Sequence, residues 1–157
     1  MMEWTHKKLV RRMANYLKGA KRMTVVMSEL ATSNSETPDV IGWIGGAAST
    51  LIEIKVSRSD FLADRKKRFR RIEDQGMGDE RYMATPPGLI KAEELPDGWG
   101  LLEVHEHHGM KNRSYIKRVV EAQSKPASKR NECVMLMSAL RRLEISTAVY
   151  VVHEGEG

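Results

Sequence analysis

The sequence has little cysteine and no long apolar run. Its single cysteine, Cys133, excludes an internal disulfide and a zinc site built from cysteines. No apolar run approaches the ~20 residues that a membrane-spanning helix needs. Residues 1–12 are charged and lack the apolar core of a signal peptide. From these absences we expect a cytoplasmic protein that does not enter a membrane.

What is present describes an ordinary globular domain with a basic segment. The chain has 157 residues, of which 41% are hydrophobic and 30% are charged, and this length suits one domain. Lys and Arg total 26 against 21 Asp and Glu, so the formal net charge is +5. Between residues 55 and 71, eight basic residues accompany only two acidic ones. This distribution favours a polyanionic partner.

Hydrophobic periodicity predicts a compact α/β domain with a mixed sheet and an appended C-terminal helix. The expected elements are a helix over 3–17, strands over 23–30, 39–44 and 51–56, a helix from Ser57, strands over 82–85 and 98–105, a helix over 127–143 and a strand over 147–152. The polar segment 111–124 is interpreted as a loop. We expect a single domain over 1–157, with its core at about 3–105 and a C-terminal extension at about 106–157.

Three charged residues stand near the predicted third strand. Glu53 and Lys55 alternate with Ile52 and Ile54, so the two charged side chains share one face of that strand. Because unpaired buried charge is costly, such a pair inside an apolar strand needs an explanation. If the neighbouring strand brings Asp39 alongside, two carboxylates and an ammonium group meet at one end of the sheet.

That arrangement suits metal-assisted hydrolysis of a phosphodiester. Two nearby carboxylates repel each other unless a divalent cation lies between them, and Mg²⁺ prefers oxygen ligands from carboxylates, water and phosphate. The cation polarises the phosphoryl group and lowers the pKa of a bound water. A lysine can orient that water or offset the charge that develops. A solvated ion pair on an edge strand is the simpler alternative explanation.

The pattern Pro38-Asp39 followed by Glu53-Ile54-Lys55 resembles the PD-(D/E)XK nuclease superfamily. The similarity extends over IEIKVSRSDFLADRKKRF, RYMATPPGLI and GWGLLEV to the MmcB-like branch associated with DNA repair, and it covers about residues 27–104. The resemblance implies a restriction-endonuclease-like fold, with a mixed sheet flanked by helices and an α-β-β-β-α-β core. No similarity covers the chain from His105 onward.

The resemblance also implies roles for individual residues. Asp39 and Glu53 correspond to metal ligands for Mg²⁺ or Mn²⁺, the main-chain carbonyl of Ile54 to a further ligand, and Lys55 to the catalytic lysine. A further acidic residue often precedes the aspartate in this superfamily. Glu29, at the end of the expected first strand, is the preferred match for it, and Glu3, in the expected first helix, is a weaker one.

The helix expected after the third strand is a candidate for binding nucleic acid. Phosphate contacts dominate nucleic-acid affinity, and this basic helix directly follows Glu53 and Lys55. The candidate phosphate-binding residues are Arg58, Lys66, Lys67, Arg70 and Arg71. A solvated helix face is the alternative interpretation.

Some remaining features have simpler structural explanations. His105, His107 and His108 resemble a metal cluster, but they lie near a strand end and are interpreted as exposed loop residues. The pair Gly45-Gly46 lacks the lysine of a phosphate-binding loop and is interpreted as a hairpin turn. Cys133 lies on an apolar stripe and is expected in the core.

Two aromatic residues likewise allow a functional and a structural interpretation. Trp43 and Tyr82 could stack on nucleic-acid bases, but core packing is the preferred interpretation for both side chains.

Together these features predict a metal-dependent nuclease that hydrolyses DNA phosphodiester bonds in DNA repair or processing. One alternative is a catalytically inactive nuclease-fold protein that binds nucleic acid or acts as a repair scaffold. Another is a metal-dependent enzyme acting on a small phosphorylated substrate. A homodimer, or a complex with a larger repair protein, is compatible with so small a domain.

Overall fold

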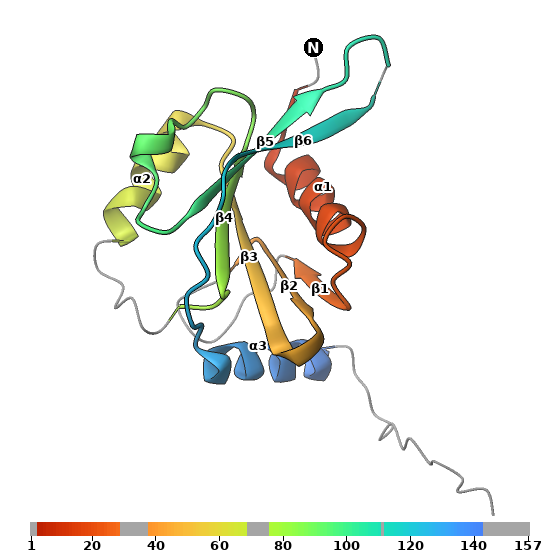
Figure 1. The fold of residues 1–157 in the computed structure, drawn as a ribbon, viewed down its shortest axis with the longest axis vertical. Coiled ribbons are helices and arrows are strands. Elements are labelled where there is room, and N and C mark those ends of the chain that lie inside the picture. Colours follow the sequence, from red (N-terminus) through yellow and green to blue (C-terminus); the bar gives the residue numbers. More distant parts are fainter. Residues whose placement is uncertain (1–2, 29–37, 69–75, 111, 143–157) are drawn as a thin grey trace, which may run out of the picture.

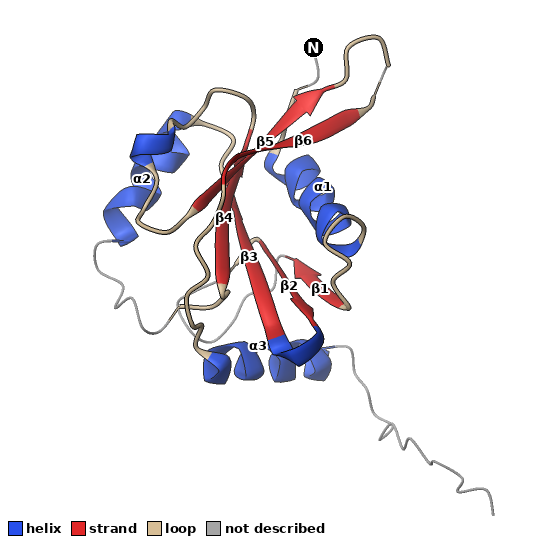
Figure 2. Ribbon diagram, in the orientation of Figure 1, coloured by secondary structure: helices blue, strands red, loops and turns tan. Residues whose placement is uncertain are grey.

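The computed structural model shows a six-stranded mixed sheet with helices on both faces (Figures 1 and 2). It describes residues 3–28, 38–68, 76–110 and 112–142, with only the backbone of 65–68. The strands are β1 (Val25–Ser28), β2 (Val40–Ile44), β3 (Ala48–Ile54), β4 (Glu80–Thr85), β5 (Gly100–Glu106) and β6 (Ser114–Val120). The helices are α1 (His6–Lys18), α2 (Arg58–Arg68) and α3 (Lys129–Arg142), with short 3-10 turns at Gly45–Ala47 and Ala92–Glu94.

The strands lie side by side in the order in which they occur along the chain. β1, β2 and β3 form an antiparallel meander, β3, β4 and β5 run parallel, and β6 returns antiparallel to β5. The parallel pairing of β3 with β4 requires a crossover, and α2 lies in that connection. The carboxyl ends of β3, β4 and β5 therefore meet at one edge of the sheet.

Alternating side chains divide the core between the two faces of the sheet. Helix α1 buries Leu9, Met13 and Leu17 against the face that carries Ile52 and Ile54. Phe61 of α2 packs on the other face with Met83 and Leu101, and Met135 of α3 packs there with Ile41, Trp43 and Leu51. Because strand residues alternate, Glu53 and Lys55 face the side that α2 covers.

The predicted helix boundaries are close to the observed ones. Thr5 caps α1 by accepting a hydrogen bond from the backbone N–H of Lys8. Gly19 ends α1, and its backbone N–H donates a hydrogen bond to the carbonyl of Asn15. Ser57 caps α2 by accepting a hydrogen bond from the backbone N–H of Asp60, as its spacing predicted.

The predicted hairpin is also present, although the bounds of its second strand shift. β3 begins at Ala48 and ends at Ile54, so Lys55 is the first residue after the strand rather than a member of it. Its backbone N–H nevertheless continues the ladder by donating to the carbonyl of Ala84. Gly46 forms the turn with φ of 75°, which only glycine adopts without strain.

Two predictions about the last third of the chain are wrong. Residues 114–120, expected in a loop, form β6 and pair with β5, so the core of the sheet extends beyond the predicted limit near residue 105. Helix α3 is present, but Cys133 is exposed instead of buried, and the helix turns Glu132 and Met135 toward the sheet. The strand expected over 147–152 lies outside the described residues.

The two aromatic residues Trp43 and Tyr82 lie where the preferred interpretation placed them. Both side chains are buried in the core. Burial and a hydrogen bond from its hydroxyl to Glu121 raise the pKa of Tyr82 to about 12.

Within residues 3–28, 38–68, 76–110 and 112–142, no helix combines the length and the apolar character needed to cross a membrane.

Candidate functional site

The pairing of β2 with β3 brings Asp39 next to Glu53 of β3 and to Lys55, the residue that follows the strand. Val40 is opposite Ile52, so Asp39, the preceding residue, is opposite Glu53. The Asp39 Oδ2 atom accepts a hydrogen bond of 2.7 Å from the backbone N–H of Ile54. The Asp39 carboxylate is thereby fixed beside the backbone that carries Glu53 and Lys55. Its Oδ1 atom lies 3.1 Å from Nε2 of His6, at the start of α1.

Lys55 provides the ammonium group at the centre of this site. Only 8% of its side chain is exposed, and a cation so deeply buried requires anionic partners. Its Nζ atom lies 3.4 Å from Oδ2 of Asp64 and 4.0 Å from Oε2 of Glu53. We refer to Asp39, Glu53, Lys55 and Asp64 as the Lys55 cluster. Strand alternation aims Glu53 and Lys55 at α2, and α2 contributes the fourth member.

Asp64 was missed in the sequence analysis. It lies three residues after Phe61, whose buried side chain fixes the inward face of α2. Residues at i and i+3 share a helix face, so this spacing could have indicated that Asp64 faces the sheet. Leu62, the residue after Phe61, is 43% exposed.

The Lys55 cluster carries more negative than positive charge. Three carboxylates, those of Asp39, Glu53 and Asp64, accompany one ammonium group. Such an oxygen-rich, anionic donor set fits a hard divalent cation such as Mg²⁺ or Mn²⁺. Among the described residues, however, no three His, Cys, Asp or Glu side chains come close enough to hold an ion by themselves. A cation here would therefore complete its shell with a main-chain carbonyl, water or substrate oxygen.

Further polar residues follow the cluster across the ends of β4 and β5. Thr85 is paired with Glu103, and the backbone bond from Lys55 to Ala84 places Lys55 on the other side of Thr85. Thr85 is completely buried, and its hydroxyl has no hydrogen-bond partner within the described part of the chain. Glu103 accepts a hydrogen bond from the backbone N–H of Gly88. Ligands commonly bind at such carboxyl ends of parallel strands.

Of the three histidines near this edge, only His105 differs from the interpretation as an exposed loop residue. His105 belongs to β5, and its Nε2 atom lies 2.9 Å from Oε2 of Glu103. His107 and His108 follow the strand and are exposed, as expected. The three residues do not form a metal site.

Arg58, predicted to contact phosphate, already has an anionic partner. Its guanidinium group forms two hydrogen bonds, of 2.7 and 2.8 Å, with the carboxylate of Glu94. These bonds lower the pKa of Glu94 to about 2, and they raise the pKa of Arg58. A phosphate at Arg58 would have to compete with this bidentate pair, so its role as a phosphate ligand stays a prediction.

The remaining predicted residues cannot be placed. Glu29, Arg70 and Arg71 lie outside the described residues, and Lys66 and Lys67 belong to the part of α2 whose side chains are not described. Their predicted roles stay predictions.

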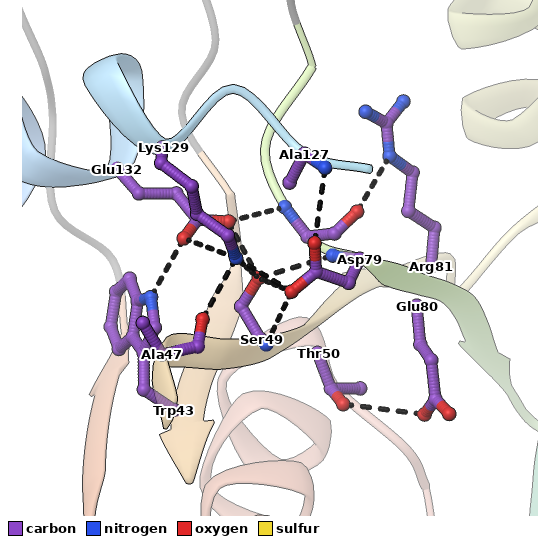
Figure 3. Close-up of polar contacts among 11 residues, drawn as sticks. Trp43, Ala47, Ser49, Thr50, Asp79, Glu80, Arg81, Ala127, Lys129 and Glu132 are labelled. Atoms are coloured by element: carbon purple, nitrogen blue, oxygen red, sulfur yellow. Dashed lines mark hydrogen bonds and ion pairs between the residues drawn. The ribbon is translucent and has the colours of Figure 1, made fainter. Parts of the chain in front are cut away.

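A second polar group, which the sequence analysis did not find, lies at the opposite end of β3 (Figure 3). The carboxylate of Glu132, a residue only 2% exposed, accepts hydrogen bonds from Trp43 Nε1, Ser49 Oγ, the Gly78 N–H and Lys129 Nζ. Asp79 accepts hydrogen bonds from the backbone N–H groups of Ser49 and Ala127 and from Lys129 Nζ. We refer to Trp43, Ser49, Asp79, Lys129 and Glu132 as the Glu132 network.

The Glu132 network has a clear electrostatic consequence. Burial on its own raises the pKa of Asp79, but the hydrogen bonds from Lys129, Ser49 and Ala127 outweigh burial, and the pKa is lowered. Burial likewise lowers the pKa of Lys129, and its bonds to Asp79 and Glu132 reverse this and raise it. The network therefore ties Lys129 and Glu132 of α3 to the segments in which β3 and β4 begin.

Comparison with known proteins supports the fold and nothing more specific. No family model and no curated protein matches the sequence. A solved structure that is similar is SPO1766, a protein of unknown function from Silicibacter pomeroyi, with a TM-score of 0.63 and 24% sequence identity. The match covers 99% of this chain and 98% of that one. The likeness extends over nearly the full length of both chains and concerns the mixed α/β fold alone.

Proposed function

We propose that this chain is a metal-dependent nuclease that hydrolyses DNA phosphodiester bonds in DNA repair or processing in the cytoplasm. We also propose that its mixed α/β fold is restriction-endonuclease-like and that it belongs to the MmcB-like branch of the PD-(D/E)XK superfamily. The single observation that supports this proposal is the bond from the Ile54 N–H to Asp39. Because of this bond, two acidic residues and a buried lysine meet at the carboxyl end of β3.

In this proposal each member of the Lys55 cluster has a role. Asp39 and Glu53 hold Mg²⁺ or Mn²⁺, together with the main-chain carbonyl of Ile54. When bound, the cation polarises the phosphoryl group and acidifies an attacking water. Lys55 stabilises the negative charge that develops on the phosphate, because its ammonium group is positioned in advance in a site with little water. Asp64 orients Lys55 through their ion pair.

Recognition of the DNA backbone is assigned to the basic segment that follows. Lys66, Lys67, Arg70 and Arg71 come directly after the cluster in the chain, and Lys66 and Lys67 belong to α2, which also carries Asp64. Their contacts to phosphate would supply affinity without base specificity.

The test is divalent-dependent cleavage of labelled single-stranded, duplex and branched DNA. The wild-type protein is expected to cleave at least one of these substrates with Mg²⁺ or Mn²⁺ and none with EDTA. Asp39→Asn, Glu53→Gln and Lys55→Ala are expected to abolish cleavage, whereas Lys7→Ala, on the exposed surface of α1, should leave it unchanged. Cleavage by all three purified site variants would remove the proposal.

A second candidate is a nucleic-acid-binding protein without catalytic activity. One observation favours it: within the described residues no three side chains form a metal site, and Lys55 is closer to Asp64 than to Glu53. This candidate predicts salt-sensitive binding of DNA without hydrolysis in any metal. Measuring binding and cleavage on the same samples separates the two.

A further inference from the structure

The β5–β6 hairpin carries an aromatic side chain, Tyr115, and a basic one, Lys117, on the same face of the sheet as the Lys55 cluster. Residues 107–119 contain four basic residues and two histidines and no acidic residue. His105 is paired with Tyr115, and Glu103 with Lys117. Val104 belongs to the core on the α1 side, and Ile116 packs against that core. By strand alternation the two pairs therefore face the opposite side, toward α2.

Tyr115 is the centre of this surface. It is 46% exposed even though its ring stacks on His105, with centroids 5.1 Å apart and planes inclined by 14°. His107 meets the same ring edge-on at 6.4 Å. His105 is in turn bonded to Glu103, which also accepts the N–H of Gly88. The tyrosine ring is thus held in place before any ligand binds, which lowers the entropy lost on binding.

The hairpin lies close to the proposed site of chemistry. Lys55, Thr85 and Glu103 occupy neighbouring positions on three adjacent strands, so Glu103 is about 10 Å from Lys55 at the usual strand spacing. His105 lies two residues beyond Glu103 on β5, and Tyr115 is its partner on β6. Figure 1 shows the hairpin projecting beyond the other strands of the sheet. A polynucleotide with a phosphate at the Lys55 cluster could therefore extend along it.

We propose that this hairpin surface binds single-stranded DNA, with one unpaired base stacked on Tyr115 and the adjoining backbone phosphate at Lys117. The proposal rests on the proposed nuclease function, which places DNA at the Lys55 cluster. A fixed, exposed ring with a lysine two residues away on the same face of β6 matches both parts of a nucleotide, the flat base and the anionic phosphate. A single strand is specified because paired bases in a duplex do not offer their faces to a side chain.

The test is fluorescence anisotropy with a labelled oligothymidylate of about 20 nucleotides and a blunt duplex of equal length, both in EDTA. Tyr115→Ala is expected to weaken binding of the single strand about tenfold, whereas Tyr115→Phe, which keeps the ring, stays within about twofold of wild type. Lys117→Ala should reduce the slope of log affinity against log salt by about 0.7, the value for one phosphate contact.

The matched control for Lys117 is Lys7→Ala, which removes the same charge from α1 on the other face of the sheet. It should leave the salt slope unchanged. The inference is overturned if Tyr115→Ala binds the single strand as tightly as wild type. It is equally overturned if the wild type binds no single strand, or if Tyr115→Ala weakens duplex binding as much.

A second substrate separates failure of this inference from failure of the nuclease proposal. Thymidine 5′-(p-nitrophenyl phosphate) has one phosphodiester and a single nucleotide, so it has no second base or phosphate to place on the hairpin. If it is cleaved, Glu53→Gln should abolish its cleavage and Tyr115→Ala should not change it. Tyr115-dependent binding of DNA without cleavage of any substrate would remove the nuclease function and leave the hairpin site standing.

Discussion

Two groups of charged residues lie at opposite ends of β3, and each is built from a lysine and nearby carboxylates. In the Glu132 network, Lys129 lies 2.6 Å from Asp79 and 3.2 Å from Glu132, and backbone and side-chain donors complete both carboxylates. In the Lys55 cluster, the lysine lies 3.4 and 4.0 Å from its carboxylates. The lysine–carboxylate distances are therefore shorter in the Glu132 network, where further hydrogen-bond donors surround both carboxylates. In the Lys55 cluster these distances are longer, and the carboxylates outnumber the lysine.

This difference in distances and charge balance indicates that similar residues have different roles in the two groups. A buried carboxylate surrounded by donors is stabilised in one geometry and joins distant segments, here α3 with the starts of β3 and β4. Carboxylates gathered around a single lysine repel one another, and such strain is characteristic of sites that acquire a ligand. We therefore interpret the Glu132 network as structural and the Lys55 cluster as functional, and the following experiments test that distinction.

The largest expected effect is on DNA cleavage, which should depend on Lys55 and not on Lys129. Lys55→Met should lower DNA cleavage about 1000-fold, because it removes a cation positioned at the reacting phosphate. Lys129→Met removes the lysine of the Glu132 network, and it should keep cleavage within about threefold at a temperature where the protein is folded. Initial rates under matched Mg²⁺ concentration measure both. If Lys129→Met lost as much activity as Lys55→Met, the two clusters would not be functionally distinct.

The next largest effect is on the free energy of unfolding. Here the larger loss is expected for the Glu132 network and the smaller one for the Lys55 cluster. Glu132→Ala should lower the free energy of unfolding by about 3 kcal/mol, because Trp43 Nε1, the Gly78 N–H and Lys129 lose a buried acceptor. Glu53→Ala should change it by less than about 1 kcal/mol, since removing one carboxylate relieves repulsion while it weakens the contact with Lys55. Urea denaturation followed by far-ultraviolet circular dichroism measures both. Equal losses would contradict the comparison.

Metal binding gives a smaller effect that does not depend on activity. A ligand that binds only the folded protein at 100 times its dissociation constant stabilises it by about 2.7 kcal/mol. Mg²⁺ or Mn²⁺ is therefore expected to raise the melting temperature of wild type and of Glu132→Gln, and to leave Glu53→Gln and Asp39→Asn unchanged. A thermal shift that persisted in Glu53→Gln would place the cation elsewhere.

Much of the Lys55 cluster could be predicted from the sequence because its pattern is local. The alternation of Ile52, Glu53, Ile54 and Lys55 determines which side chains share a face, and a short hairpin leaves few ways to pair Asp39 with them. Asp64 was missed, although its spacing from Phe61 carried the signal.

The Glu132 network could not be predicted because its partners are distant in the chain. Glu132 bonds to Trp43, Ser49 and Gly78, which are 89, 83 and 54 residues away. Hydrophobicity assigns a glutamate to the surface, so the inward face of α3 was misjudged and Cys133 was expected in the core instead. Only the tertiary contacts show that this carboxylate is buried.

Strand β6 was missed for a different reason. It is an edge strand whose side chains are largely exposed, so it lacks the alternation of apolar and polar residues that identifies a half-buried strand. Its pairing with β5 is therefore not evident from its own residues. The exposed side chains of β6 include Tyr115 and Lys117, the two residues proposed to bind single-stranded DNA.

The smallest expected effect is the acid sensitivity of the Glu132 network. The pKa of Asp79 is lowered in the folded protein from its ordinary 3.8, so its contribution to stability is complete above that pH. The contribution is lost as the pH falls from 3.8 through the folded value, because the unfolded chain then binds the proton first. Asp79→Asn should therefore be less stable at pH 7 and lose less stability between pH 4 and about 2 than wild type. Glu53→Gln, a change in the other cluster, should retain the wild-type contribution of Asp79, and urea midpoints across this range measure the contrast. A wild-type acid profile in Asp79→Asn would mean that the bonds to Lys129, Ser49 and Ala127 do not stabilise the charged carboxylate.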